Sequence, residues 1–336
     1  MTKANLSLIR KEHIFEDCRP FLSCHASTLV ELNNRDILVA WFGGTAEKNP
    51  DTAIWYSRYK DGNWSYPEVL ADEEGIALWN PVFFNTLDGR FVLYYKVGVN
   101  ERKWYTKFII SEDNGLSWTD PEELVPGDVG GRGPVKNKPI VLHDGTWLAP
   151  ASDESSYWNS FVDISEDKGK TWMASPYVEL DYSKFNGEGV IQPTLWESEP
   201  NVVHMLLRSS NGWIYRSDSS DGGRTWCPIY KTSLPNNNSG FDVVKLEDGT
   251  LVLIYNPINK NWGPRNIIVV SVSKDNGLTW PYTCTLEDNE DIKAEYSYPS
   301  IIANGNEVAM TYTWKRERIA FVKCSLDEII QARDNE

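Results

Sequence analysis

Apolar and polar residues alternate in short runs along most of the chain, as is typical of β-strands with one buried face. The runs come in pairs joined by a polar turn such as LDG, HDG, EDG or NGN, where Gly and Asn tolerate the positive φ of a hairpin. A third apolar run follows each pair. Six such units are expected, and their first two strands lie in HASTLVEL and DILVAWF, NPVFFNTL and GRFVLYYK, NKPIVLH and GTWLAPA, IQPTLW and NVVHMLLRS, FDVVKL and GTLVLIYN, YPSIIA and NEVAMTYTW.

One eight-residue segment recurs between these units at a constant spacing. It reads SEDNGLSW, SEDKGKTW, SSDGGRTW and SKDNGLTW, and the closing residues Trp118, Trp172, Trp226 and Trp280 are 54 positions apart. Trp64, at the end of SRYKDGNW, lies one period earlier and predicts a degenerate fifth copy. We expect the Asp to accept backbone N–H bonds in a turn, the Gly to adopt positive φ and the Trp to pack between strands. The segment is therefore structural, with no catalytic Asp.

A fixed period of about this length is typical of radial or solenoid repeats, and sheets of about four strands repeated radially form a propeller. The pattern therefore predicts an all-β fold, a six-bladed β-propeller that occupies residues 1–336 as one domain. The sixth unit has no room for its own segment before Glu336, so NLSLIRKEHIF is expected to add the missing outer strand and close the ring. Only the tail LDEIIQAR shows a helical period.

Composition limits the partners. The formal net charge is −15 and no basic block occurs, so neither nucleic acid nor an anionic membrane is expected as a partner, and an anionic ligand would need a local basic patch. The five cysteines show no CxxC spacing, so no metal site, disulfide framework or cofactor is indicated. MTKANLSLIRKEH lacks the apolar region of a signal peptide, which favours a cytoplasmic location. No pattern indicates an oligomeric state.

The innermost strand of each propeller blade lines the central channel, so ligand-binding residues are expected where the first strand of each unit begins. The residues at these positions are mostly polar, and they are His25, Trp79, Asn80, Asn137, Lys138, Gln192, Asp242 and Tyr298. Arg208 in LLRSS and Arg265 in GPRNIIVV fall on adjacent blades, where two planar guanidinium forks can clamp a carboxylate. Further candidates at strand ends or entry loops are Lys96, Lys136, Glu154, Tyr312 and Lys315.

The segment SxDxGxxW on a six-fold β-repeat resembles the Asp-box of the sialidase (neuraminidase) superfamily, and the resemblance extends along nearly the whole chain. In that family three arginines bind the substrate carboxylate and a tyrosine acts as nucleophile. The resemblance implies that Arg208 and Arg265 are two of the arginines and that Tyr298, in SYPSI, is the tyrosine. His25, in HASTLV, stands where the first arginine of the family would be.

Two positions depart from the family pattern. Gly43, in AWFGGT, stands where the family has its acid/base aspartate, and the nearest carboxylates are Glu47 and Asp51. Gln192, in VIQPT, stands where a glutamate activates the tyrosine, and Glu188 lies four residues earlier. An amide cannot act as the base that a tyrosine nucleophile needs.

Three functions remain open. The first is an exo-acting glycosidase that removes a terminal acidic sugar, with the arginines on the carboxylate, Asp51 or Glu47 as general acid and Tyr298 at the transition state. The second is a lyase that eliminates at a uronic acid, with His25 as base and Tyr298 as acid. The third is a glycan-binding propeller without chemistry. In that third case the partners of the sugar hydroxyls would be Asn238, Asp242, Tyr255 and Asn256.

Overall fold

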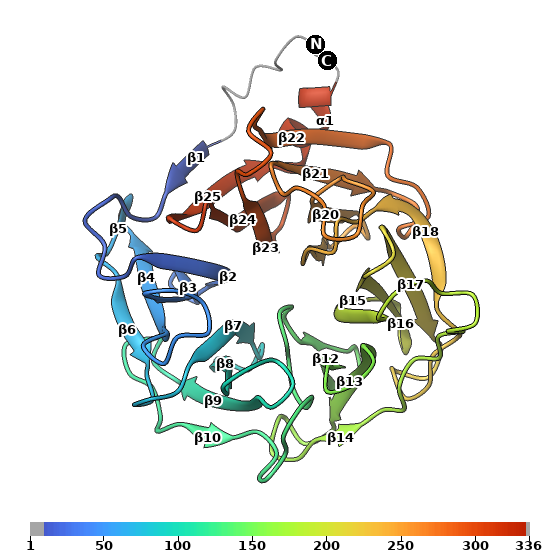
Figure 1. Cartoon of the computed structure of the whole chain (residues 1–336), viewed down its shortest axis with the longest axis horizontal. Coiled ribbons are helices and arrows are strands. Elements are labelled where there is room, and N and C mark those ends of the chain that lie inside the picture. Colours follow the sequence, from blue (N-terminus) through green and yellow to red (C-terminus); the bar gives the residue numbers. More distant parts are fainter. Residues whose placement is uncertain (1–9, 334–336) are drawn as a thin grey trace.

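A computed structural model of the protein describes residues 10–333 and shows six antiparallel sheets arranged radially around a central axis (Figure 1). Five sheets follow chain order from the axis outward, and in the sixth the strands β23, β24 and β25 do so before β1 is added at the outer edge. The predicted all-β six-bladed propeller is therefore confirmed. The apolar runs form the strands, and their buried side chains build apolar clusters that neighbouring blades share.

The strands of each blade are as follows. Blade 1 contains β2 (Ser23–Glu31), β3 (Ile37–Gly44), β4 (Ala53–Lys60), β5 (Asn63–Trp64) and β6 (Glu68–Ala71). Blade 2 contains β7 (Leu78–Asn85), β8 (Phe91–Val97), β9 (Tyr105–Ser111) and β10 (Glu122–Glu123). Blade 3 contains β11 (Ile140–Val141), β12 (Trp147–Asp153), β13 (Asn159–Ser165) and β14 (Met173–Ala174). Blade 4 contains β15 (Val190–Glu199), β16 (Val202–Ser209), β17 (Trp213–Ser219) and β18 (Tyr230–Pro235). Blade 5 contains β19 (Asp242–Lys245), β20 (Leu251–Tyr255), β21 (Ile267–Ser273) and β22 (Tyr282–Asp288). Blade 6 contains β23 (Tyr296–Asn304), β24 (Glu307–Trp314), β25 (Arg318–Ser325) and β1 (Arg10–His13).

The outer strand of blade 6 comes from the beginning of the chain. Strand β1 pairs antiparallel with β25, with Arg10 opposite Lys323 and His13 opposite Ala320. The first residues of the strand that we expected from NLSLIRKEHIF lie outside the described residues. Helix α1 (Leu326–Arg333) follows β25 and packs Leu326 and Ile329 into the core shared by blades 5 and 6.

The four recurrent segments form the expected turns. Asp113 accepts hydrogen bonds from the backbone nitrogens of Leu116 (3.0 Å) and Ser117 (2.9 Å), and Gly115 has a φ of +72°. Asp167, Asp221 and Asp275 likewise accept hydrogen bonds from the backbone nitrogen and the hydroxyl of the residue four positions later. The Asp carboxylate is therefore occupied within its own turn, which explains why the motif repeats without carrying chemistry.

The degenerate fifth copy is not such a turn. In SRYKDGNW, Asp61 (φ 50°) and Gly62 (φ 88°) form a two-residue hairpin that pairs Lys60 with Asn63. Two successive positive φ values are what a tight hairpin of this kind requires. Trp64 lies on the short strand β5, and its indole nitrogen donates to Glu12 of β1 at 2.7 Å.

The centre of the ring is filled by polar side chains of blade 3. The Nζ of Lys136 donates to the carbonyl oxygens of Phe241 (3.2 Å) and Pro299, in blades 5 and 6. Asn137 donates to the carbonyls of Gln192 and Pro193 in blade 4, each at 3.0 Å. Blade 3 is thereby tied to three other blades, and burial lowers the pKa of Lys136 to about 7.

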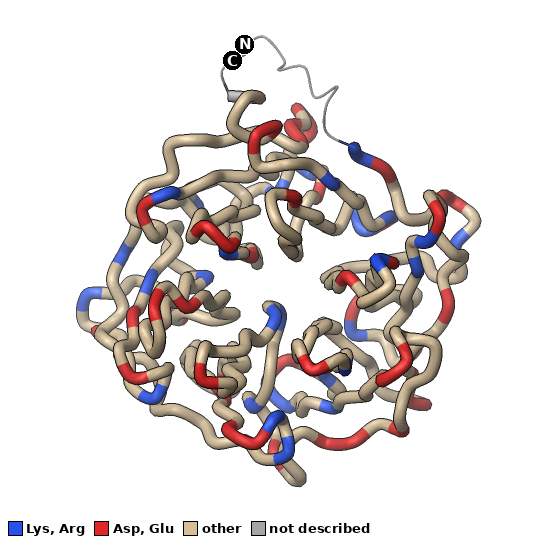
Figure 2. The backbone as a smooth tube through the Cα atoms, turned by 180° about the vertical axis from the view of Figure 1, so that it is seen from behind, with Lys and Arg blue, Asp and Glu red and all other residues tan. Residues whose placement is uncertain are grey.

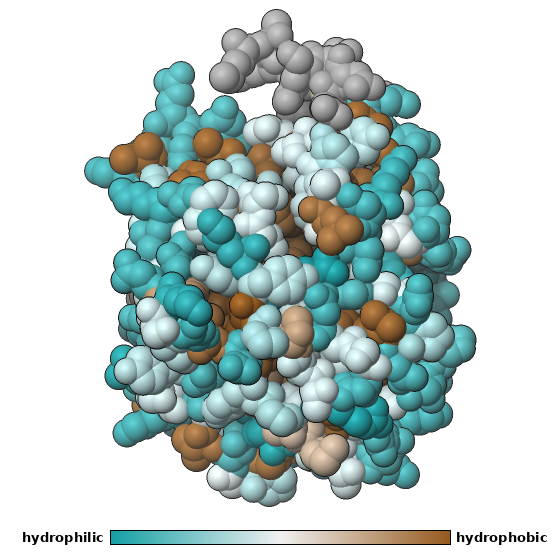
Figure 3. Space-filling view, turned by 90° about the vertical axis from the view of Figure 1, so that its right-hand side faces the viewer, coloured by the Kyte–Doolittle hydropathy of each residue, from teal (hydrophilic) through white to brown (hydrophobic). Residues whose placement is uncertain are grey.

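The outer surface is largely hydrophilic with separate apolar patches on the side seen in Figure 3. Lysines and arginines are interspersed with acidic residues around the ring seen from behind (Figure 2). No helix among residues 10–333 has the length and apolar character needed to cross a membrane.

Candidate active site

A cavity of about 610 Å³ opens on one face of the ring, around its axis. In a meander the first strand begins, the second ends and the third begins on the same face. The cavity is accordingly lined by the beginnings of innermost strands and by loops that join second strands to third strands. These loops are residues 45–52, 98–104, 154–158, 256–266 and 315–317.

Three innermost strands present a side chain to the cavity through the same distortion. Asn80, Gln192 and Tyr298 all have positive φ, at 40°, 53° and 50°, and each lies where the pairing with the second strand shifts register. Each also precedes a proline. A bulge of this kind re-aims a side chain that would otherwise lie along the sheet, so it brings these three residues to the cavity wall.

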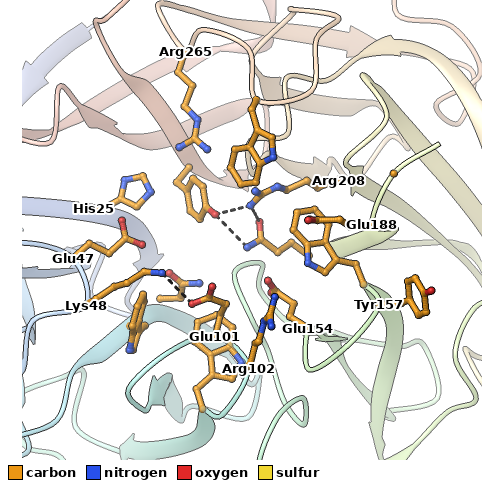
Figure 4. A pocket seen from close by; sticks show the side chains of 18 of the residues that line it. His25, Glu47, Lys48, Glu101, Arg102, Glu154, Tyr157, Glu188, Arg208 and Arg265 are labelled. Carbon is orange, nitrogen blue, oxygen red and sulfur yellow. Dashed lines mark hydrogen bonds and ion pairs between the residues drawn. The ribbon is translucent and has the colours of Figure 1, made fainter. Parts of the chain in front are cut away.

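Arg208, near the end of β16, lies at the centre of the site (Figure 4). Its Nη1 donates to the phenol oxygen of Tyr298 at 2.6 Å and to Oε1 of Gln192 at 3.0 Å. Its Nε donates to Oδ1 of Asn238 at 2.8 Å. The guanidinium also lies 5.5 Å from the centre of the Trp158 ring. The guanidinium of Arg208 is buried, and these polar and aromatic partners hold it in one orientation.

Two further arginines share one half-buried carboxylate. Arg265 donates from Nη1 to Oε1 of Glu295 at 2.9 Å, and Arg316 donates from Nε to Oε2 of Glu295 at 2.8 Å. Burial works against ionisation of Glu295, but the charged guanidinium groups of Arg316 and Arg265 outweigh it and hold the pKa of this carboxyl well below its usual range. Glu295 thus fixes both guanidinium groups, while Arg208, Arg265 and Arg316 all line the same cavity.

His25 lines the cavity beside Tyr298, with a distance of 4.3 Å between the two ring centres. Its Nδ1 lies 2.9 Å from the hydroxyl of Thr313, and its Nε2 lies 3.5 Å from Nη2 of Arg316. Burial and the charge of Arg316 lower the pKa of His25 well below 6.5. The imidazole is therefore neutral at pH 7, and both of its nitrogens face protein partners.

Four carboxylates line the cavity, and their surroundings differ. Glu47 pairs with Arg316 at 2.5 Å, and Glu101 pairs with Lys48 at 3.3 Å. Glu188 is exposed to solvent. Glu154 is 8% exposed, and burial raises the pKa of its carboxyl to about 7.

Aromatic side chains form part of the cavity rim. Tyr157 and Trp262 are 64% and 60% exposed, and Trp262 lies edge-on to Trp158 with 6.4 Å between ring centres. Exposed rings beside a polar cavity are suited to stacking on the apolar faces of sugars.

Several predicted site residues lie outside the cavity. Asp51 is exposed and accepts hydrogen bonds from the backbone and hydroxyl of Thr45, within its own loop. Lys138 pairs with the fully buried Asp242 at 2.8 Å, and Lys136 donates to backbone carbonyls; none of the three lines the cavity. Because their polar atoms already bind protein, these four residues serve the scaffold.

The two tyrosines predicted to bind substrate also lie in the core. Tyr255 is 5% exposed and packs between blades 4 and 5. Tyr312 is fully buried, and its hydroxyl donates to Glu287 at 2.8 Å. Lys96 is likewise buried and donates to the carbonyl of Arg132, and Asn256 donates to the carbonyls of Ile267 and Tyr296. None of these four residues lines the cavity.

Gly43 does not stand in for a lost acid. A Cβ at Gly43 would meet Phe21 at 3.0 Å and Trp55 at 3.2 Å, so a side chain there would enter the core of blade 1. An aspartate at this position could not reach the cavity. The loop that follows brings Glu47 to the cavity instead.

Arg316 was not among the site residues predicted from the sequence, although its neighbour Lys315 was. The hairpin of residues 315–317 belongs to the same class of loop that carries Arg265, so its position on the cavity face was a usable signal. Lys315 instead lies 4.4 Å from the centre of the Trp314 ring. The sequence prediction also left out five other cavity residues in loops between second and third strands. They are Lys48, Glu101, Arg102, Trp158 and Trp262.

The fold and the cavity together define a sialidase-like β-propeller. Residues 35–310 match the family of BNR repeat-like domains, and the chain belongs to that family. A sialidase of Clostridium perfringens is 23% identical over 328 residues, which cover 83% of this chain and 78% of that protein. A sialidase of Micromonospora viridifaciens is 25% identical over 221 residues, which cover 63% of this chain and 31% of that protein.

Solved structures show the same fold. A Hadza microbial sialidase superposes with a TM-score of 0.79 at 17% identity, over 94% of this chain and 68% of that one. A protein of unknown function from Dyadobacter fermentans superposes with a TM-score of 0.74 at 18% identity, over 94% of this chain and 98% of that one. A leech intramolecular trans-sialidase superposes with a TM-score of 0.74 at 15% identity, over 96% of this chain and 71% of that one. At these identities the likeness establishes the fold.

Proposed function

We propose that the protein is an exo-acting glycosidase that removes a terminal acidic sugar, of the sialic or uronic acid type, from an oligosaccharide or glycoconjugate. One observation carries the proposal: three arginines from three blades line a single cavity around Tyr298. A guanidinium fork matches the geometry of a carboxylate and stays charged, so three of them attract and orient an acidic sugar even in an acidic protein.

Arg316 supplies the third cation in this proposal. The family resemblance placed His25 where an arginine would stand, and Arg316 lies beside His25 from the opposite end of the chain. His25 then has a positioning role, because its neutral ring fills the space and its Nε2 accepts from Arg316 without adding charge.

Tyr298 would lie beneath the anomeric carbon and stabilise the oxocarbenium-like transition state. Arg208 donates to its phenol oxygen, and the guanidinium of Arg265 lies 5.6 Å from the centre of its ring. Gln192 approaches the same oxygen at 3.4 Å through Nε2, so it supports the tyrosine but cannot remove its proton. The chemistry therefore depends on electrostatic stabilisation more than on an activated nucleophile.

The lyase alternative has weaker support. A base that abstracts a proton near neutral pH works best with a pKa close to that pH. Burial and Arg316 lower the pKa of His25 well below its usual value, and its two nitrogens contact Thr313 and Arg316. The glycan-binding alternative uses the same arginine clamp as the glycosidase. Only a measurement of product formation distinguishes the two functions.

The test is a screen of oligosaccharides that end in N-acetylneuraminic acid or glucuronic acid, with product masses measured. Products that gain one water support hydrolysis, and products with unsaturated uronate absorbance support elimination. Thermal protection without any product would leave only a binding propeller.

Arg265→Ala should reduce kcat/KM by about 10²–10³-fold, because each preorganised donor to a charged group contributes on that order. Its melting temperature should change little, since Glu295 keeps its bond to Arg316. Arg224→Ala is the matched control, because Arg224 pairs with the exposed Glu166 outside the cavity. Equal activity of Arg265→Ala and wild type would remove Arg265 from the substrate site.

A further inference from the structure

We propose that Glu154 is the proton donor to the leaving group, an inference that rests on the proposed glycosidase function. It assigns the general acid to blade 3, in the loop of residues 154–158 between β12 and β13, and not to the blade 1 loop where the sequence pattern directed attention.

The geometry of Glu154 supports this assignment. Figure 4 shows its side chain extending into the cavity from the side opposite to Arg265. The residue is 8% exposed, and its Oε1 has no hydrogen-bond partner among the described residues. Buried polar atoms are nearly always paired in folded proteins. Glu154 lines the cavity, and its buried Oε1 is not committed to a protein partner, so the carboxyl group remains available to bind an atom of the substrate.

The charged groups around Glu154 act in both directions. Burial is the largest influence and raises the pKa of Glu154 to about 7, while Arg208 and Lys96 oppose the rise and Glu101 and Asp153 add to it. A carboxyl group with this pKa is partly protonated at neutral pH, as a general acid must be.

The other carboxylates of the cavity are committed or solvated. Glu47 binds Arg316, and Glu101 binds Lys48. Glu188 is exposed, and Asp51 lies outside the cavity. Among the cavity-lining carboxylates in the described part of the chain, Glu154 alone combines burial with an unpaired oxygen.

The proton balance of the step is complete within the site. The bond between the anomeric carbon and the leaving oxygen breaks, and the leaving oxygen takes the proton of Glu154. A water molecule then adds its oxygen to the anomeric carbon and returns one proton to the Glu154 carboxylate. The net reaction consumes one water and regenerates the acid, so no other reactant is needed.

Glu154→Gln tests this role with two kinds of leaving group. On disaccharides with an alkyl leaving group, kcat/KM should fall by about 10²–10⁴-fold, the usual contribution of a general acid. On the 4-nitrophenyl glycosides of N-acetylneuraminic acid and glucuronic acid, which need little protonation, the loss should stay below about 10-fold. The decline in wild-type activity above about pH 7 should disappear in the variant.

A stability measurement checks the same group without substrate. A folded-state pKa raised above the unfolded value means that Glu154 destabilises the fold once pH rises through that range. Glu154→Gln should therefore raise the melting temperature at pH 8 and leave it unchanged at pH 4. Glu166→Gln, an exposed residue of the same blade, is the control and should change neither activity nor this pH dependence.

The possible results distinguish failure of the glycosidase function from failure of the proton-donor role of Glu154. If wild type cleaves none of these glycosides, the glycosidase function fails whatever Glu154 does. If wild type is active and Glu154→Gln loses activity equally on both kinds of substrate, with an unchanged pH profile, the proton-donor role is wrong. Full activity of the variant on disaccharides would also overturn it.

Discussion

At the scale of single residues, the site depends on backbone conformations that side chains rarely adopt. Asn80, Gln192 and Tyr298 hold positive φ inside strands, and non-glycine residues in such regions cost about 1–3 kcal/mol each. The strain persists because the surrounding sheet and the following proline hold it in place. Without the bulges these side chains would lie along the blade. The strained conformations therefore lower the stability of the fold but bring three side chains to one cavity.

Gln192→Glu tests whether the missing base limits catalysis. The new carboxylate would keep the contact with Arg208 and would lie beside the phenol oxygen of Tyr298, where it can accept the phenol proton. We expect kcat on 4-nitrophenyl glycosides to rise at least about 10-fold, since general bases commonly contribute about 10²–10⁴-fold. A glycosyl adduct on Tyr298 should become detectable by mass spectrometry.

Gln192→Ala is the control for this change, because it removes the contact without adding a base. It should lower activity. If Gln192→Glu also lowers activity, the tyrosine does not act as a nucleophile in this protein, and electrostatic stabilisation remains its role.

At the scale of elements, the recurrent turns of blades 2 and 5 join these blades to the preceding ones. Arg58 of blade 1 donates to the carbonyl of Asn114 at 2.7 Å, and Arg216 of blade 4 donates to the carbonyl of Asn276 at 2.7 Å. Asn276 also accepts from the indole of Trp196 at 2.7 Å. The motif therefore has two functions: it closes its own turn and provides a carbonyl to which the neighbouring blade binds.

Arg216→Met should destabilise the protein by about 2 kcal/mol. The variant leaves Asp218 without its 2.9 Å partner and the Asn276 carbonyl without a donor. Breaking a fully buried pair costs about 3–5 kcal/mol, and the partial exposure of Asp218 reduces that figure. Chemical denaturation would measure the change.

The matched control is Arg224→Met, because the pair of Arg224 with Glu166 is exposed and such pairs contribute about 0–1 kcal/mol. Both variants should retain activity. Equal losses of stability in the two variants would contradict a specific role of the contact between blades 4 and 5.

At the scale of the whole molecule, the ring is stabilised by the same carboxylate turn in several blades. Hydrogen bonds from Ser117 and Thr171 lower the pKa of Asp113 and Asp167 to about 2, and Thr279 outweighs burial to do the same for Asp275. A folded-state pKa below the unfolded value contributes stability that is present above about pH 4 and is lost as pH falls toward 2.

The melting temperature should therefore fall steeply as pH drops from about 4 to 2, as calorimetry can measure. Glu295 acts in the same direction, because its pKa is also lowered. Replacing Asp113 by Asn should make the fall shallower. An equally steep fall in that variant would show that the turns do not govern acid unfolding.

Much of the architecture could be predicted from local pattern. Period-two alternation, glycine turns and a 54-residue spacing depend on neighbours close in the chain, so they indicate strands, hairpins and the number of blades without coordinates. The beginnings of innermost strands also pointed correctly to His25, Asn80, Gln192 and Tyr298 as cavity residues. Spacing alone predicts the wrong turn at Trp64, because a tight two-residue hairpin lies where the repeat period predicts another copy of the recurrent segment.

The remainder of the site required the closed ring. Arg316 meets His25 across 291 positions, and Lys136 meets Pro299 across 163, so no local pattern relates them. The side to which Tyr255, Tyr312 and Asp242 turn depends on packing between blades. The raised pKa of Glu154 likewise depends on burial that only the assembled cavity creates. The chain's own order thus specifies the blades, while their closure into a ring selects which polar groups face the ligand and which hold the scaffold.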